Sequence, residues 1–468
     1  MSNTLAPAWL TEPVDAAALA PRVWSENTHR DAAGGITIAG LSASELAREF
    51  GTPLYVFDEA DVRARATRIR EALDSACAAA GTTGHVYYAS KAFLSGAVAK
   101  WMVDAGLRVD VASQGELELA LAAGVPAARI GLHGNNKSDT ELARAAEVGV
   151  GSLVIDSADE VVRVADAARA AGAILNVRLR VNTGVHASTH EYLATAREDQ
   201  KFGVALGHAT VIVADIRSHA ELNFLGLHSH IGSQIFGESG FHEAATRLLN
   251  VHEELLRGGP VPELNLGGGF GIAYTAADEP ADVPTLVSDL VADIAARCSE
   301  RGIAVPAIAI EPGRSIVGTG GTTLYTAGTI KPVDVVDDNG ASGVRTYVSV
   351  DGGMSDNMRT ALYHADYSVA LADRVSTAAP ILVRVVGKHC ESGDIVVRDG
   401  YLPGDVHAGD ILAVPTTGAY CHSLANNYNG LARPAVVAVR DGKASVIVRR
   451  ESLADLFSRD TQLGRETP

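Results

Sequence analysis

Reactive side chains stand at the ends of several short apolar runs in this chain. Lys91 follows the run HVYYAS, and His230 lies in the sequence HSHIGSQ after another such run. Three consecutive glycines at 267–269 follow PELNL, and Glu311 and Arg314 follow AIAI in the sequence EPGR. A partly desolvated lysine loses its proton more readily and can form a Schiff base with a carbonyl. Glycine backbone N–H groups can approach an anion closely, so these motifs favour a small ligand with a carbonyl and an anionic group.

Each of these residues also has a simpler explanation. Lys91 alone is most simply a surface lysine, His230 a core histidine with satisfied hydrogen bonds, and Glu311 with Arg314 a structural ion pair. Glycine turns are common, and GGGFG does not match the GxGxxG fingerprint of dinucleotide sites. Together, however, an amine, an imidazole face, an anion cradle and an acid that can face a ring nitrogen match the needs of pyridoxal phosphate. The combination predicts this cofactor, although no single residue does.

The apolar runs are strand-like and alternate with helical segments rich in Ala, Arg and Glu. We count eight of them, at 85–90, 107–113, 128–134, 152–157, 175–182, 224–230, 262–269 and 307–313. Strands that are apolar on both faces and alternate with helices indicate a parallel sheet. Eight such units match a (β/α)8 barrel better than an open doubly wound sheet, and the functional residues of such a barrel lie where its strands end. A long insertion at 185–203 follows the fifth run.

The rest of the chain predicts a second, C-terminal domain of antiparallel β structure, so the fold class of the whole chain is α/β. Short strands punctuated by Gly, Asp and Pro replace the helical repeat after the eighth run, as expected of an antiparallel β-sandwich or barrel. The strand-like runs that flank an N-capped helix at Ser42–Glu49 should join this domain, because chain termini often lie together. We expect four segments: a loosely packed N-terminal arm at 1–34, strands of the β domain at 35–54, the barrel at 55–318 and the β domain at 319–468.

Composition narrows the possible functions. The 468 residues are 47% hydrophobic, which suits a soluble chain of two domains. With 39 Lys and Arg against 56 Asp and Glu, the formal net charge is −17, and such a surface repels nucleic acid and anionic membranes. The N-terminus lacks the features of a secretory signal, and no apolar stretch approaches the roughly 20 residues of a membrane span. Four scattered cysteines without zinc-type spacing predict a cytoplasmic protein with no metal site.

The motifs, taken together, resemble one known family. Eight of them run in the family's order from residue 85 to 420: YYASKA, DVASQGEL, HSHIGSQ, LNLGGGFG, EPGR, DNMRTALY, HCESGD and TGAY. They are similar to the motifs of the fold-type III pyridoxal-phosphate-dependent decarboxylases, whose barrels are like that of alanine racemase. Within this family, the chain most resembles the branch that converts meso-2,6-diaminopimelate to L-lysine and CO2, the last step of lysine biosynthesis. The match covers nearly the whole chain apart from the N-terminal arm.

The resemblance implies which residues contact the cofactor. Lys91 should hold pyridoxal phosphate covalently, and His230, which directly precedes Ile-Gly-Ser, should stack on its ring in preference to His228. Glu311 should face the ring nitrogen and keep it protonated, where alanine racemases typically have an arginine. The remaining contacts, most of them to the phosphate, fall to Ser233, Gly268, Gly269, Pro312, Gly313, Arg314 and Tyr420.

The resemblance also implies a catalytic residue in the second domain. Cys390 in HCESGD should donate a proton during the reaction, although a free cysteine is more often a small buried hydrophobe. Its neighbours Glu391 and Asp394 argue against an apolar setting. In the family this loop reaches the active site of the other subunit, which implies a homodimer with shared active sites. Many relatives have Gly-Pro-x-Cys here, whereas this chain has Lys388 and His389 before the cysteine, which leaves the loop backbone less restrained.

Substrate choice depends on the far end of the substrate. Diaminopimelate carries a second amino-acid group there, which needs a guanidinium for its carboxylate and an acid for its ammonium. Arg314, Arg359 and Tyr363 can supply the first need, because arginine binds carboxylates in a bidentate way. Glu391 can supply the second, with Tyr420 also close to the substrate.

Other functions remain open at this stage. An ornithine or arginine decarboxylase of the same fold would be harmed by an unpaired arginine at the far end of its substrate. For Arg359 itself, the simpler alternative is an interdomain salt bridge. A racemase is disfavoured by Glu311 and by CESGD. A catalytically silent regulatory homologue should have lost Lys91 or Cys390, and both are present.

Overall fold

The computed structural model describes residues 5–185, 200–336, 340 and 342–463. The chain forms two units that are interleaved in sequence. The barrel unit contains residues 63–272 and 279–316, and the β unit contains the described parts of 1–62, 273–278 and 317–468. Most of the 185–203 insertion lies outside the described residues.

Eight parallel strands close into a barrel in the barrel unit. Their order around the barrel follows the sequence, and the last strand pairs with the first, residues 308–310 against 84–86. The strands are β5 (Gly84–Ala89), β6 (Arg108–Val111), β7 (Ile130–Leu132), β8 (Ser152–Ile155), β9 (Leu175–Asn182), β11 (Leu222–His228), β12 (Glu263–Asn265) and β13 (Ala307–Ile310). A two-residue strand, β10 (Val204–Ala205), pairs with β9 from outside this ring. The predicted (β/α)8 barrel is confirmed, and each predicted run overlaps one of its strands.

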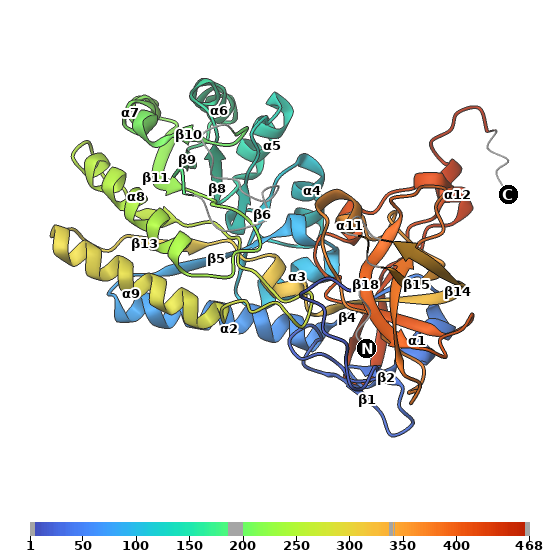
Figure 1. Cartoon of the computed structure of the whole chain (residues 1–468). Helices are drawn as coiled ribbons and strands as arrows, with labels where there is room; N and C mark the ends of the chain where they lie inside the picture. Colours follow the sequence, from blue (N-terminus) through green and yellow to red (C-terminus); the bar gives the residue numbers. More distant parts are fainter. Residues whose placement is uncertain (1–4, 186–199, 337–339, 341, 464–468) are drawn as a thin grey trace. The chain divides into compact units, whose positions relative to one another are not determined.

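Helices cover the outside of the strands, as Figure 1 shows. They are α2 (Glu59–Ala79), α3 (Gly96–Asp104), α4 (Gln114–Ala122), α5 (Asp139–Val148), α6 (Ala158–Ala171), α7 (Ala209–Ser218), α8 (Ser239–Leu256), α9 (Val283–Arg301) and the short α10 (Arg314–Val317). Polar side chains cap several of them. Ser138 and Glu141 form a capping box at α5, and Asp282 caps α9. None of the described helices is long and apolar enough to cross a membrane.

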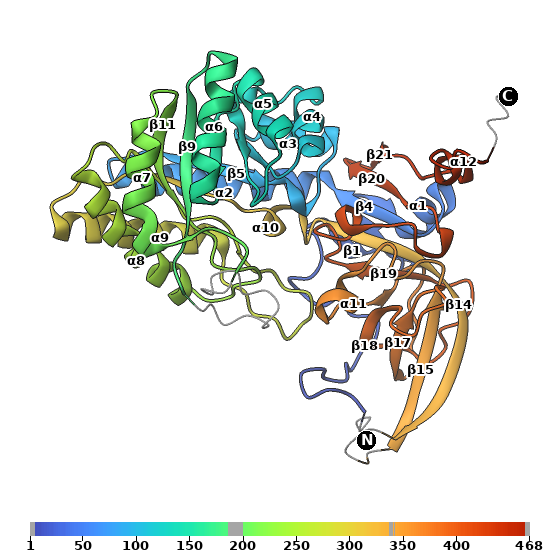
Figure 2. The same cartoon turned by 90° about the horizontal axis from the view of Figure 1, so that it is seen from above.

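The β unit is built on a mixed sheet, whose long strands are visible in Figure 2. The strand order is β18 (Ile395–Pro403), β17 (Pro380–Val386), β15 (Ser342–Val350), β14 (Gly321–Val336), β4 (Leu54–Asp58), β20 (Ala435–Arg440) and β21 (Lys443–Val448), with β19 (Ile411–Pro415) and β16 (Ala370–Leu371) joined through β14. Most pairs are antiparallel, as predicted, but β15 with β17 and β20 with β4 are parallel. The predicted fold class is therefore confirmed, and the second sheet is mixed.

The N-terminal segment packs more tightly than its composition suggests. Val23 and Trp24 are buried in the core of the β unit, together with Ile36 and Ile38 of β2 (Ile36–Ile38). The expectation of a loosely packed arm at 1–34 is wrong for Val23 and Trp24, because apolar side chains scattered among Ala and Pro still pack into a core. Five short elements complete this unit: the strands β1 (Thr28–Arg30) and β3 (Leu41–Ser42) and the helices α1 (Ala43–Phe50), α11 (Arg359–Tyr363) and α12 (Leu453–Phe457). Ser42 precedes α1 as predicted, but its side chain makes no capping hydrogen bond.

Candidate active site

Lys91 lies directly after β5, in a short 3₁₀ helix of residues Ser90–Ala92, and it is exposed. Burial, followed by the charge of Lys91, lowers the pKa of His230 well below its usual value. Burial raises the pKa of Asp110 in β6, and the charge of Lys91 acts to lower it. The amine is therefore within electrostatic range of two other strand ends of the barrel.

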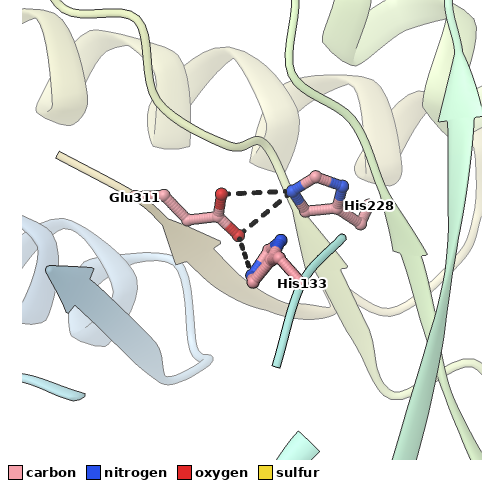
Figure 3. Close-up of side chains that lie close together, drawn as sticks. All are labelled: His133, His228 and Glu311. Carbon is pink, nitrogen blue, oxygen red and sulfur yellow. Dashed lines mark hydrogen bonds and ion pairs between the residues drawn. The ribbon is translucent and has the colours of Figure 1, made fainter. Parts of the chain in front are cut away.

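Glu311 directly follows β13, and polar side chains from the ends of three other strands surround its carboxylate. Figure 3 shows two of them, His228 and His133. His228, the last residue of β11, places its Nε2 3.1 Å from Glu311 Oε2. Asn265, the last residue of β12, donates an Nδ2–H bond to Oε1 over 2.8 Å. His133, just after β7, has its Nε2 3.5 Å from the same oxygen. The carboxyl ends of four strands thus meet at one carboxylate.

The surroundings of Glu311 favour its ionised form. Burial lowers the pKa of His133 and of His228 to about 4, so both imidazoles are neutral near pH 7. Burial alone would raise the pKa of Glu311, but the two histidines and the hydrogen bond with His228 lower it well below its usual value. An ionised carboxylate at this point can face a ring nitrogen and keep it protonated.

The same cluster offers ligands for a metal ion. His133, His228 and Glu311 each present one ligand atom, and these atoms lie within 4.8 Å of one another. A nitrogen that donates its N–H to a carboxylate has no lone pair left for a metal. Since both His228 and Asn265 hydrogen-bond to Glu311, we interpret the cluster as a carboxylate held by donors.

The glycines after β12 leave no space for side chains. A Cβ atom at Gly267 would lie 2.2 Å from the carbonyl oxygen of Ser229, and one at Gly268 would lie 2.1 Å from that of Glu311. At Gly269 the distance to the carbonyl oxygen of Gly232 would be 2.4 Å. The Gly268 N–H donates to His230 Nδ1 over 3.2 Å, so the glycine turn and the imidazole are joined. Three backbones meet here closely enough to line an anion site.

Arg314 and Ser233 lie together at the same end of the barrel. Arg314 Nη2 donates to Ser233 Oγ over 2.9 Å, and Arg314 is buried. The Ala89 N–H at the end of β5 donates to the Pro312 carbonyl over 3.1 Å, and a Cβ at Gly313 would lie 2.9 Å from the Ala89 carbonyl oxygen. With the amine, the ionised acid and the glycine turn, these residues fit pyridoxal phosphate.

Arg359 is buried in the β unit without an acidic partner. It begins α11, and its Nη1 donates to the Tyr367 hydroxyl over 2.6 Å. Its guanidinium carbon lies 4.4 Å from the ring centroid of Tyr274 and 5.5 Å from that of Tyr367. No Asp or Glu among the described residues forms a salt bridge with Arg359. Burial acts to lower the pKa of Arg359, but the surrounding phenol groups and Cys421 raise it above its usual value. The guanidinium therefore stays charged.

The other predicted residues of the β unit lie at or near its surface. Cys390 and Glu391 are exposed in the loop that joins β17 to β18, and Tyr363 ends α11 half-buried. Tyr420 is half-buried and has a left-handed backbone with φ of 63°. A residue other than glycine adopts that conformation at a cost of about 1–3 kcal/mol, and such strain clusters at functional sites.

Comparison with known proteins agrees with this geometry. The family model described as the pyridoxal binding domain of pyridoxal-dependent decarboxylases matches residues 59–318. The diaminopimelate decarboxylase of Mycobacterium tuberculosis is 48% identical over 452 residues, which covers 95% of this chain and 99% of the relative. This chain belongs to the pyridoxal-dependent decarboxylases.

More distant relatives of this decarboxylase carry the same name. The diaminopimelate decarboxylase of Bacillus subtilis is 44% identical over 431 residues, covering 91% of this chain and 95% of that one. Among solved structures, a diaminopimelate decarboxylase from M. jannaschii in complex with L-lysine has a TM-score of 0.85 at 31% identity, covering 93% and 98% of the two chains. A lysine/ornithine decarboxylase from Vibrio vulnificus, at 23% identity and a TM-score of 0.68, shares the fold.

The polar side chains around Glu311 were not predicted from the sequence. Asn265 ends β12 and His133 directly follows β7, and a place at the carboxyl end of a barrel strand was the available signal. His228 lies two residues before His230, and the structure places it on Glu311, whereas His230 bonds to Gly268. Asp110 was also missed as a single residue, although its motif DVASQGEL was recognised.

Proposed function

We propose that this chain converts meso-2,6-diaminopimelate to L-lysine and CO2, the activity that the names of its curated relatives give for them. The observation that carries the substrate assignment is the buried, charged guanidinium of Arg359, which no described carboxylate neutralises. An unpaired buried charge costs several kcal/mol, and an anionic group of the substrate offsets that cost. The second carboxylate of diaminopimelate supplies such a group, whereas ornithine has only an ammonium at its far end. We place the reaction in the cytoplasm, which the sparse cysteines favour.

When pyridoxal phosphate is bound, it supplies an electron sink for the electron pair of the bond that breaks as the carboxylate leaves. Lys91 would hold it through Nζ, and Glu311 would keep a proton on its ring nitrogen. His230 would pack on the ring face. The backbone at Gly268 and Gly269 would bind the phosphate together with Ser233, Pro312, Gly313 and Arg314, and Tyr420 would complete the set.

The substrate would be recognised at both ends. Arg314, Arg359 and Tyr363 would bind the distal carboxylate, and Glu391 would bind the distal ammonium. Cys390 would deliver the proton that replaces CO2. This role suits an exposed thiol that is free of any disulfide.

The test of this proposal is CO2 release from diaminopimelate and from ornithine by the purified chain with added pyridoxal phosphate. We expect turnover of diaminopimelate only. In Arg359→Gln we expect KM for diaminopimelate to rise about 10- to 100-fold, since one charge-assisted contact is worth about 1.5–3 kcal/mol. Arg440→Gln is the matched control, because Arg440 is exposed and forms ion pairs with Glu59 and Asp441, neither of which is assigned to the site. Equal turnover of ornithine, or an unchanged KM in Arg359→Gln, would rule out the substrate assignment.

The family resemblance further suggests a homodimer in which the Cys390 loop of one subunit serves the site of the other. Subunits with Lys91→Ala and subunits with Cys390→Ala should each be inactive alone. If sites are shared, random mixing of the two variants makes half of all dimers mixed. Each mixed dimer has one intact site out of two, so the mixture should have about a quarter of the wild-type activity. Co-expression and a CO2-release assay measure this directly. A mixture as inactive as its parents would show that each site is built from a single chain.

The remaining alternatives are weaker. A regulatory homologue without activity would have no need of Lys91, Cys390 and an ionised Glu311 in one chain. An ornithine or arginine decarboxylase would need an acidic group at the far end of its substrate, and Arg359 has the opposite charge.

A further inference from the structure

The loop between β17 and β18 carries Cys390 and differs from the pattern of many relatives. Lys388 and His389 stand between Gly387 and the cysteine, where proline restrains the backbone in those relatives. His389 is nevertheless buried, and its side chain has no exposed surface. Its neighbours Lys388 and Cys390 are both exposed. A fully buried side chain between two exposed ones identifies His389 as the point at which this loop is anchored.

The carboxylate of Asp394 holds one side of His389. Its Oδ2 accepts the His389 backbone N–H over 2.8 Å and lies 3.0 Å from His389 Nδ1. Its Oδ1 accepts the N–H of Met354 over 2.6 Å. Backbone bonds from Gly387 to the Asp394 carbonyl and from Lys388 to the Gly352 carbonyl close the start of the loop. One buried carboxylate thus joins the two ends of the loop that carries Cys390.

Close packing leaves this carboxylate little freedom. A Cβ at Gly387 would lie 2.2 Å from Asp394 Oδ2, and one at Gly353 would lie 2.5 Å from Asp394 Oδ1. The glycines therefore let the backbone approach the acid, and the acid in turn fixes the imidazole.

The other side of the loop rests on residues Tyr428 and Asn429. The His389 ring stacks on Tyr428 with a centroid distance of 5.6 Å and an interplanar angle of 3°. The next residue, Asn429, has a left-handed backbone with φ of 53°, and its Oδ1 accepts the Cys390 N–H over 3.0 Å. One short segment thus contacts both the ring of His389 and the backbone of Cys390.

We propose that His389 is a positioning residue for Cys390. In many relatives a proline restrains the backbone before this cysteine. In this chain the contacts of His389 with Asp394 and Tyr428 fix the backbone instead, and so hold the exposed thiol in one place. The inference rests on the proposed function in one respect: it takes Cys390 as the proton donor. His389 does not itself relay the proton, because its Nε2 is buried and has no hydrogen-bond partner among the described residues.

A pair of substitutions separates this role from general packing. The amide nitrogen of asparagine can occupy the place of Nδ1, whereas that of glutamine reaches toward the place of Nε2. We therefore expect His389→Asn to retain kcat within about 5-fold, and His389→Gln and His389→Ala to lose about 10- to 100-fold, as misplacement by about 1 Å can cost. KM for diaminopimelate should change little, since His389 contacts no substrate group. Lys388→Ala, at the exposed neighbour, is the control and should match the wild type.

Alkylation of Cys390 by iodoacetamide gives a second readout that needs no turnover. The other three cysteines, Cys77, Cys298 and Cys421, are buried, so the rate reports Cys390. We expect an altered rate in His389→Ala and His389→Gln, and wild-type rates in His389→Asn and Lys388→Ala. Equal kcat and equal alkylation rates in all four variants would overturn the proposal, as would loss in His389→Asn as deep as in His389→Ala. If the wild type fails to release CO2 from diaminopimelate, the proposed function fails, and the alkylation series still decides the role of His389.

Discussion

Replacing Lys91 by alanine is expected to abolish the visible absorbance band that arises from the covalent link between lysine and cofactor, and to lower kcat by more than about 10³-fold. Lys91 is the amine at the carboxyl end of the barrel whose charge acts on both His230 and Asp110. Alanine removes the covalent link and a group that can exchange protons with the substrate. The glycine turn and Arg314 are unchanged, so the phosphate should still bind weakly. Absorbance of the purified variant with added pyridoxal phosphate and a CO2-release assay measure the two effects.

The control for this variant is a second lysine of the barrel unit. Lys100 is exposed on α3 and has no part in the site. Lys100→Ala should keep the absorbance and the rate of the wild type. An unchanged spectrum in Lys91→Ala would show that another amine holds the cofactor, and the assignment of this site would be lost.

The barrel could be predicted because its signals are local. All four residues of β8 are buried, as expected of a strand that is apolar on both faces. Reactive residues such as Lys91 and Glu311 directly follow runs of this kind, so their place in the barrel follows from their place in the sequence. The ring of donors around Glu311 is different. His228 lies 83 residues before Glu311, and only closure of the barrel brings the two together.

Long-range pairing also explains what the sequence did not reveal in the β unit. Strand β4 pairs with β14 on one side and with β20 on the other, so residues near 55 contact residues near 323 and 436. Tyr274 comes from the chain segment between β12 and α9 of the barrel, yet it packs on Arg359 of α11. Hydrophobic periodicity carries no information on such partners, because it depends only on residues close in sequence.

The second large effect concerns where the protons lie on the two buried acids of the site. Burial, with the charge of Glu311, raises the pKa of Asp110 well above its usual value, which favours its protonated form. The neighbours of Glu311 lower its pKa despite burial, which favours its ionised form. Neither oxygen of Asp110 accepts a hydrogen bond from the described residues, although His133 Nε2 lies 3.1 Å from Oδ1. The two shifts are opposite, so we expect the negative charge of the pair to reside on Glu311.

This difference predicts opposite outcomes for two substitutions that each replace a carboxyl by an amide. Glu311→Gln removes the anion and turns an N–H toward the donors His228 and Asn265, so we expect kcat to fall by about 100-fold or more and stability by about 1–3 kcal/mol. Asp110→Asn puts a neutral amide of the same shape in place of an acid whose neutral form is favoured, so we expect kcat within about 10-fold of the wild type. Steady-state CO2 release and thermal unfolding of both variants measure these effects. A greater loss in Asp110→Asn than in Glu311→Gln would place the charge on Asp110, and Glu311 could then not keep a ring nitrogen protonated.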